Sequence, residues 1–425
     1  MKGEKHVPTM VVAVASCVAV AVLTQVVVLL TGYSGRDLVE VFPLSRFNGP
    51  RIVWSGVPYA VLFLALLWFS LRPRLTQTRA WLLGLGFIVL GNLAQGGLRR
   101  AFLLPLQLFQ PGRLYMEAAC RIDSWTEWLG SFTGLQSTLF RAPGTHPPFA
   151  VLLYRLLGTP GVVAIVFTLI ASLSIPLVGR VLLTVGMDRK RAALGALLFA
   201  LVPAVNIYCG VSLDGVILTT CSLCLLGLAR LVYEDRWSWG AFAMTGVGLL
   251  LTNALTFGGL FLAGVMLALA FRKREVLRAL LLVAVVSVVV VAVLRLAFGY
   301  DHIRAFLNAS TLENPHGFEL IGNTVHYAFT RLENVGNVLL LMPLTALALF
   351  LHRRPERIGG AAIAVLGAVF LTGAYRTGET ARATLFIYPF LFLSFRDLNE
   401  ATLRYLIAGA GIQTIIMQLI AGYGS

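Results

Sequence analysis

Charge is scarce in this chain, and its scarcity excludes an ordinary soluble globular protein. Only 12% of the 425 residues are Asp, Glu, Lys or Arg, whereas 58% are hydrophobic, and the mean hydropathy is +0.83. Soluble domains contain about a quarter charged residues. Apolar runs close to the roughly 20 residues that cross a hydrocarbon core recur from end to end. The sequence therefore predicts an integral membrane protein.

Nucleotide-binding motifs are missing as well. The sequence contains neither a Walker A motif nor a dinucleotide-binding fingerprint, which argues against an ATP-driven machine. Cysteine is rare, with five residues and no zinc-type spacing. Cys221 and Cys224 form a CxxC pair inside an apolar run, where small residues usually pack against a neighbouring helix. We expect no nucleotide cofactor and no redox site.

The apolar runs predict an all-α, polytopic membrane protein with about 11–13 transmembrane helices. A long extracytoplasmic loop should contain short interfacial helices. We expect one domain over 1–425, with the first three spans in 9–96, the loop and the start of a proline-initiated helix in 97–160, and the remaining spans in 161–425. The candidate spans are 9–31, 54–71, 80–96, 161–184, 191–207, 214–233, 239–253, 255–271, 277–298, 335–351, 358–374, 383–395 and 403–421.

Basic residues gather on alternate connections, which indicates the orientation. With a cytoplasmic N-terminus, the cytoplasmic connections are RPRLTQTR, MDRKR, YEDRW, FRKREVLR, HRRPER and RDLNEATLR. All four lysines also fall on that side. The net charge of +15 therefore reflects this bias and attraction to anionic headgroups, and it does not require a nucleic-acid partner. We predict a multi-pass protein of a bacterial inner (plasma) membrane.

Four predicted outer segments carry the polar residues that the charge bias does not explain. They are 97–148, 206–215, 299–334 and 375–382, and their parity places them all on one face. A helical bundle can bring such segments together. We therefore expect a site at the extracytoplasmic surface.

The first outer loop holds two candidate acids, Glu117 and Asp123, near Trp125 and Trp128. If the stretch is helical, Asp123 and Glu127 share one face. One interpretation is an amphipathic helix in the headgroup region. The other is a carboxylate that acts as a general base near the membrane surface. The residues leave both interpretations open.

The same loop ends in THPPF, residues 145–149. Two adjacent prolines cannot lie inside a helix but can begin one, because the first helical position needs no N–H donor. Thr145, His146 and Pro147 thus precede a helix that is too short to cross the membrane alone. His146 is either a capping residue or a group of the site.

An acidic residue in the first large outer loop, followed by HPP and a helix, resembles the GT-C glycosyltransferases, which include protein O-mannosyltransferases and aminoarabinose transferases. The order THPPF, SLD, GYDHIRAF and RTGETARATLFIYPF, over about residues 97–395, is similar to bacterial multispanning members of this superfamily. The resemblance departs at YMEAA, where the acid is Glu117 rather than an Asp, and more than one span precedes the key loop.

The resemblance implies a glycosyltransferase that uses a polyprenyl-phosphate-linked sugar and transfers it, with inversion, to a glycan, lipid or protein acceptor. Glu117 or Asp123 would be the general base, and His146 would contact the donor phosphate or the acceptor. No cofactor is implied, although a divalent metal ion remains compatible. Thr145, Pro147, Asp214, Asp301, Arg331, Arg376, Glu379 and Arg382 are the candidate substrate-binding residues.

Several of these residues have structural interpretations too. Asp214 begins a span, where its charge is favourable against the helix dipole. Asp301 belongs to a loop whose acids and histidines match no metal-ligand spacing. Arg376 and Arg382 flank Glu379, which can orient both guanidinium groups. Alternative functions are a transporter or lipid-linked glycan flippase, or a non-catalytic GT-C-like protein of envelope assembly.

Overall fold

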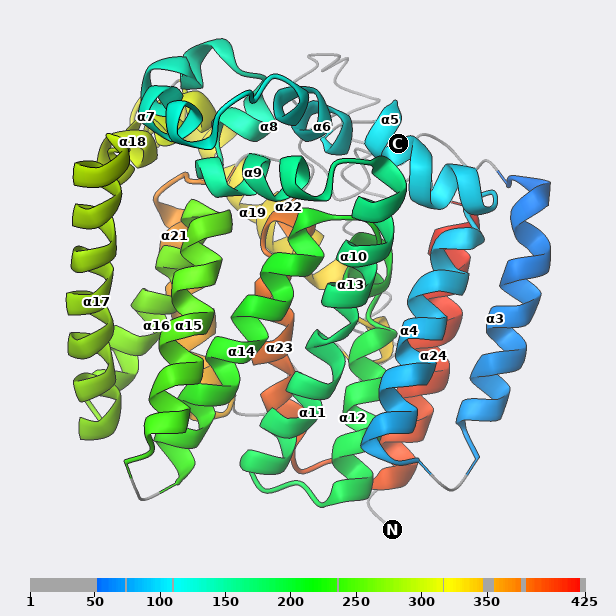
Figure 1. Ribbon diagram of the computed structural model, residues 1–425. Helices are drawn as coiled ribbons and strands as arrows, with labels where there is room; N and C mark the ends of the chain where they lie inside the picture. The colour runs from blue at the N-terminus through cyan, green and yellow to red at the C-terminus, as the bar shows by residue number, and fades with distance from the viewer. Residues whose placement is uncertain are drawn as a thin grey trace.

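The computed structural model describes residues 52–72, 75–108, 111–234, 237–315, 317–346, 355–375 and 380–420. Every regular element in these ranges is helical, in agreement with the predicted all-α class (Figure 1). The predicted first span, 9–31, lies outside the described residues.

Upright helices stand side by side and form the body of the molecule (Figure 1). Their positions agree with most predicted spans to within a few residues. They are α3 (Val57–Ser70), α4 (Gln77–Leu93), α10 (Pro160–Ser172), α11 (Ser174–Thr184), α12 (Arg189–Ala200), α13 (Pro203–Tyr208), α14 (Leu213–Tyr233), α15 (Trp239–Leu255), α16 (Leu260–Ala270), α17 (Arg274–Phe298), α19 (Thr324–Leu340), α21 (Arg357–Leu371), α23 (Tyr388–Leu391) and α24 (Glu400–Ile420).

Short helices form a layer across one end of the bundle, at the top of Figure 1. Most of them belong to the predicted first outer loop. They are η2 (Arg99–Leu103), α5 (Leu104–Gln107), α6 (Gly112–Cys120), α7 (Trp125–Leu135), η3 (Gln136–Thr138), α8 (Arg141–Gly144), α9 (Pro148–Leu157) and α18 (His302–Glu313). We call this end the loop end.

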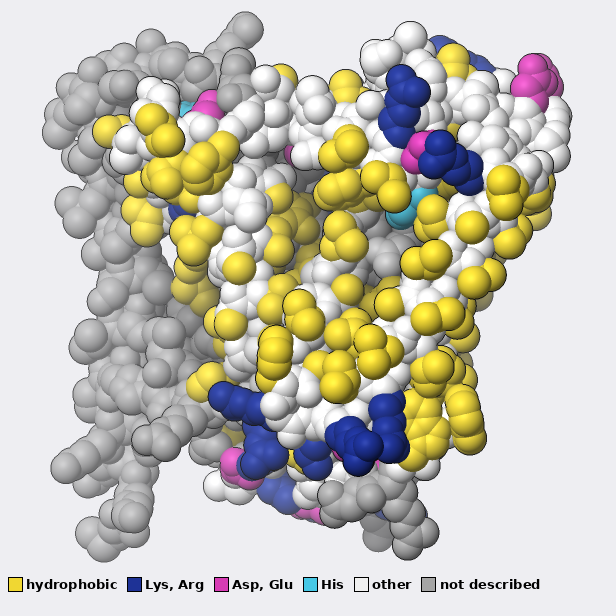
Figure 2. All heavy atoms as spheres, turned by 90° about the vertical axis from the view of Figure 1, so that its left-hand side faces the viewer, with side chains coloured by type: hydrophobic (Ala, Val, Ile, Leu, Met, Phe, Trp, Pro, Cys, Tyr) yellow, Lys and Arg dark blue, Asp and Glu magenta, His cyan; other side chains and the backbone are white. Residues whose placement is uncertain are grey.

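The opposite end is basic. Figure 2 shows hydrophobic side chains over the middle of one face and Lys and Arg gathered at its lower edge. The turn between α16 and α17 lies there and contains Arg272 and Lys273, and Arg274 begins α17. The start of α12, with Arg189, Lys190 and Arg191, is at the same end. We call this the basic end.

Three helical stretches are long and apolar enough to cross a membrane, judged by length and composition: Pro160–Thr184, Leu213–Tyr233 and Arg274–Phe298. Their surroundings differ. Within the most apolar 18-residue window, 89% of the α14 residues are buried but only 17% of those in α17. α14 is therefore the central helix, whereas α17 leaves an apolar surface exposed at the rim.

Small residues let α14 and α15 approach closely. A Cβ atom at Gly248 would lie 2.4 Å from the backbone nitrogen of Cys224, and one at Gly227 would lie 2.5 Å from the carbonyl oxygen of Ala241. Cys221 and Cys224 are buried free thiols in this interface, as expected for residues that pack. Close backbone approach through small residues is typical of helix pairs in apolar surroundings.

The helix at the predicted span 335–351 begins earlier than expected. The structure has α19 over Thr324–Leu340, and residues 347–351 lie outside the described ranges. The reason is the polar content of α19, where Thr330, Asn334 and Asn337 are buried and hydrogen-bonded. Hydropathy assigned these positions to a loop or a span edge, although they lie inside the bundle.

Candidate functional site

The THPP corner begins a helix, as the sequence predicts. Pro147 is the N-cap of α9, with an extended backbone (φ −60°, ψ 154°), and Pro148 is its first residue. The corner is also tied to α18: the Arg141 side chain donates to both carboxylate oxygens of Glu313, at 2.7 and 3.2 Å. Buried Gln136 donates to the carbonyl groups of Gly144 and Ala305, each at 3.0 Å. The position of His146 is therefore well fixed.

His146 is half-buried, and its Nδ1 atom lies 2.9 Å from the Ala142 carbonyl oxygen. A carbonyl oxygen only accepts, so this contact places a proton on Nδ1. In the neutral ring, Nε2 is then the unprotonated acceptor. The Thr145 hydroxyl donates to the same carbonyl at 3.3 Å. The corner thus presents an imidazole in one tautomer.

Tyr115 of α6 completes the corner. Its hydroxyl donates to the Ala142 carbonyl oxygen at 3.1 Å, and its ring meets His146 edge-on with a centroid separation of 5.7 Å. It also stacks on Tyr154 of α9 at 5.0 Å. Burial raises the pKa of Tyr115 well above its usual range, so the hydroxyl remains a donor. Sequence reasoning missed both tyrosines.

Asp214 and Arg382 form an ion pair. Arg382 Nε donates to Asp214 Oδ2 at 2.8 Å, and the two side chains are only 19% and 16% exposed. Ser212 caps α14 by accepting from the Asp214 backbone N–H at 3.0 Å, and its hydroxyl donates to Asp214 Oδ2 at 2.9 Å. Asp214 thus holds a mostly buried guanidinium group in a defined orientation.

Two amides of α19 position the segment that carries Arg382. This arginine belongs to α22 (Thr380–Ala383). The Thr380 hydroxyl donates to Asn334 Oδ1, and the Ala381 backbone N–H donates to Asn337 Oδ1, both at 2.6 Å. The signal in the sequence was the pair of asparagines three positions apart, just before the apolar run 338–342, because this spacing places both on one helix face.

The backbone just before Asp214 has a rare conformation. Val211 has φ of 59°, and it is the one non-glycine residue with positive φ in the described part of the chain. A β-branched residue in this region is strained. The Val211 N–H donates to the Thr168 hydroxyl at 3.3 Å, which helps to hold the turn. The strained turn aims the first residues of α14, including Asp214.

His146, Asp214 and Arg382 share one electrostatic environment. Burial lowers the pKa of His146; the negative charge of Asp214 and the bond to Ala142 oppose this change, and the positive charge of Arg382 adds to it. The same two charges act on the pKa of Tyr115. The charges of Asp214 and Arg382 therefore reach the THPP corner, and Figure 1 shows α9, the start of α14 and α22 toward the loop end.

The two predicted base candidates lie elsewhere. Glu117 forms an ion pair with Arg113 one turn away in α6, with Nε and Oε1 3.3 Å apart. Two residues correspond to about 200° around a helix, so Glu117 faces away from Tyr115 and His146. Asp123 is exposed in the connection between α6 and α7, and the stretch containing it is not one continuous helix.

Asp301 and Arg331 have structural partners. Asp301 caps α18 by accepting from the Arg304 N–H at 3.0 Å, and it lies 3.5 Å from Arg295. The Arg331 guanidinium donates to the Phe370 carbonyl and, at 2.7 Å, to that of Tyr375, which fixes the end of α21. Arg376 and Glu379 lie outside the described residues.

Among the described residues, no three His, Cys, Asp or Glu side chains are grouped closely enough to hold a metal ion. Comparison with family models, with curated proteins and with solved structures gives no match.

Proposed function

We propose that this chain is a polytopic membrane protein that transfers a sugar from a polyprenyl-phosphate donor to an acceptor at the extracytoplasmic face. Three long apolar helices and the exposed apolar rim of α17 support the membrane assignment. Exposed tryptophans also lie at both ends of the bundle, as in aromatic belts. Trp54 and Trp125 belong to elements at the loop end, and Trp68 and Trp239 lie at the basic end.

The charge distribution supports the orientation. The basic end contains the α16–α17 turn and the start of α12, each with consecutive Lys and Arg residues, and it lies opposite the loop end. The cytoplasmic side of a membrane protein carries the excess of Lys and Arg. In this orientation the loop end faces outward, with 11–13 helices and a cytoplasmic N-terminus. We place the protein in a bacterial inner membrane.

The observation that carries the proposal is that His146 lies near enough to the Asp214–Arg382 ion pair for both charges to act on its ring. An arginine oriented by a carboxylate is suited to bind a phosphate group. An imidazole that is neutral, with Nε2 as acceptor, is suited to receive a proton. A lipid-linked sugar phosphate and an acceptor hydroxyl need these two functions.

In the proposed reaction the acceptor hydroxyl oxygen attacks the anomeric carbon from the face opposite the phosphate. The new C–O bond forms as the bond between the anomeric carbon and the phosphate oxygen breaks. The electron pair leaves with the polyprenyl phosphate, whose charge Arg382 stabilises, and the hydroxyl proton moves to His146 Nε2. One displacement of this kind inverts the anomeric configuration and needs no covalent intermediate.

The test is the release of polyprenyl phosphate by the purified protein from a panel of lipid-linked sugars. We expect His146→Ala to lower release about a hundredfold or more, the usual contribution of a general base. Arg382→Gln should lower it by about the same factor, the usual contribution of a group that stabilises developing charge. Glu117→Gln and Asp123→Asn are the matched controls and should retain it. If a control variant loses release while His146→Ala retains it, the general base is Glu117 or Asp123 of the first outer loop and not His146.

One observation favours a transporter as the second candidate. Helices α12 and α13 are interrupted at Leu201 and Val202, and buried amides lie beside the break. Asn92 donates to the Asn206 carbonyl at 2.8 Å, and Gln418 donates to Asn206 Oδ1 at 3.1 Å. Broken helices with polar groups are typical of transporters. Translocation of a fluorescent lipid-linked glycan in proteoliposomes, without its cleavage, would favour this function.

A further inference from the structure

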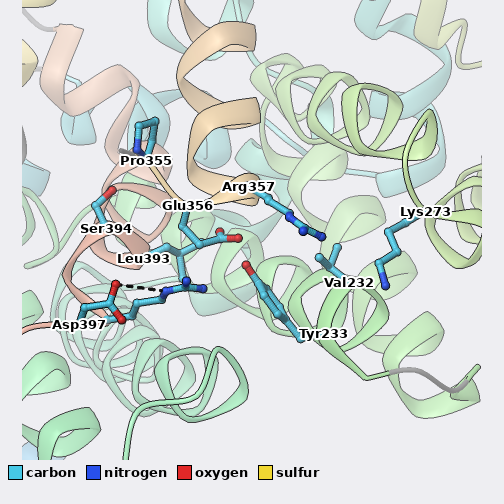
Figure 3. Close-up of a pocket in the computed structure, with 10 residues that line it drawn as sticks. Val232, Tyr233, Lys273, Pro355, Glu356, Arg357, Leu393, Ser394 and Asp397 are labelled. Atoms are coloured by element: carbon cyan, nitrogen blue, oxygen red, sulfur yellow. Dashed lines mark ion pairs between the residues drawn. The ribbon is translucent and has the colours of Figure 1, made fainter. Parts of the chain in front are cut away.

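A polar cavity lies at the basic end, opposite the loop end in Figure 1. Figure 3 shows its lining residues. Its volume is about 630 Å³. The walls come from the end of α14, the α16–α17 turn, the start of α21 and the segment after α23. The lining residues are Val232, Tyr233, Lys273, Pro355, Glu356, Arg357, Leu393, Ser394, Arg396 and Asp397.

Three cations and two acids line this cavity. Arg396 Nε lies 3.6 Å from Asp397 Oδ2, which is longer than a hydrogen bond. Arg357 is exposed at the start of α21, and within the described residues no ion pair involves it. Lys273 comes from the α16–α17 turn. In Figure 3 the Arg357 and Glu356 side chains extend into the space that Tyr233 and Lys273 border.

Unpartnered polar atoms also line the cavity. Among the described residues, Ser394 Oγ, Tyr233 Oη and Glu356 Oε1 are buried without a hydrogen-bond partner. The Ser394 and Glu356 residues are only 6% and 7% exposed. Buried polar groups are normally paired, so three such atoms around one cavity indicate a ligand that completes them.

Glu356 has a structural role beside this cavity. Its Oε2 atom caps α21 by accepting from the Ile358 N–H at 2.8 Å. Burial raises its pKa, whereas the capping N–H groups and the charge of Arg396 oppose this change. The lining therefore contains three cations, two acids and two hydroxyl donors, so positive groups outnumber negative ones.

We propose that this cavity binds a phosphate group, either that of a membrane phospholipid or that of a small soluble phosphate ester. Arginine with hydroxyl donors is the usual combination for phosphate recognition. The site is distinct from the THPP corner, and its chemistry stands without the proposed sugar transfer. Only its placement in the cytoplasmic leaflet depends on the proposed orientation.

The experiment measures binding by the full chain. Lipid binding is read by native mass spectrometry from nanodiscs of equal parts phosphatidylcholine and phosphatidylglycerol. Soluble binding is read by the melting shift with glycerol 3-phosphate in detergent. We expect one of the two probes to bind saturably, and Arg357→Gln with Ser394→Ala to weaken it about tenfold or more. Arg278→Gln, an exposed arginine of α17 at the same end, is the matched control.

Each outcome decides the proposal. Lipid binding lost in the double variant but kept in Arg278→Gln assigns a phospholipid, and the same result with glycerol 3-phosphate assigns a soluble ester. Absence of saturable binding, or equal binding by wild type and double variant, overturns the site. If the double variant fails to fold, Tyr233→Phe replaces it. Sugar transfer should persist in these variants, and phosphate binding should persist in His146→Ala, so either proposal can fail alone.

Discussion

At the scale of single residues, the buried setting of His146 predicts how stability changes with pH. Burial lowers its pKa from the ordinary value of 6.5, so the folded state disfavours the charged ring. The stability of the folded state is therefore complete above 6.5 and declines as the pH falls from there through the lowered folded value. We expect the melting temperature of the wild type to fall in this window and His146→Gln to lack that part of the fall.

The check is a series of melting curves in detergent from pH 8 down to about pH 5, the range that brackets an ordinary histidine. The two proteins should differ by a constant amount above the window. Equal declines on acidification would contradict the assigned environment of His146.

The Asp214–Arg382 pair predicts a second effect at this scale. Removing one partner of a buried pair leaves an uncompensated charge, so Asp214→Ala should lower the free energy of unfolding by about 3 kcal/mol. Asp214→Ala combined with Arg382→Met should recover part of this loss, because no charge remains buried. Denaturant unfolding of the single and double variants measures the coupling, and additive losses would refute it.

The sequence alone predicts some residues of this site and misses others. Thr145, His146 and Pro147 stand out by type and order, because two prolines must begin a helix. Tyr115 and Glu117 are two positions apart, and only the helical phase of α6 decides which one faces the corner. That phase is set by packing against α9, which a single sequence does not reveal.

At the scale of elements, the contact between α14 and α15 predicts an asymmetric response to alanine. At Gly248 a Cβ would meet the backbone of Cys224 at 2.4 Å, so Gly248→Ala should lower the free energy of unfolding by about 1–3 kcal/mol. Gly367 in α21 has nothing within 4 Å of its Cβ position. Gly367→Ala should be neutral or stabilising by about 0.5–1 kcal/mol.

Thermal unfolding of both variants in one detergent compares them directly. A similar loss at the two positions would mean that the response reflects glycine in general and not the approach of the two helices.

Element positions were predictable where a helix is uniformly apolar, as in α14 and α17. The start of α19 was missed because Asn334 and Asn337 interrupt its apolar pattern. These amides satisfy the start of α22, and a partner 44 to 46 positions away is not visible in local hydropathy.

At the scale of the whole molecule, the proposed orientation predicts which thiols react from outside. Cys120 at the loop end is exposed and free. Cys17 lies outside the described residues and is replaced by serine, so that it does not contribute to labelling. In this background, a membrane-impermeant maleimide should label Cys120 in intact spheroplasts. A cysteine introduced by Arg274→Cys at the basic end should react only after permeabilisation. Cys120→Ser gives the background, and the reverse pattern of labelling would invert the orientation.

The sequence predicted that distant outer segments meet, since parity of the spans places them on one side. It did not predict which residues touch. Asp214 and Arg382 are 168 positions apart, and the choice of Arg382 over its neighbours depends on how α22 docks. The cavity at the basic end likewise arises from four separate segments, and none of them carries a motif of its own.

The Ala142 carbonyl oxygen is approached by three donors, from Tyr115, Thr145 and His146. A carbonyl oxygen has two lone pairs, so the three donors compete for two acceptor positions. A bound molecule that accepts a hydrogen bond from the Thr145 or Tyr115 hydroxyl therefore strengthens the hydrogen bond between His146 and the Ala142 carbonyl. Occupancy of the corner and the alignment of its ring are coupled through a single backbone atom.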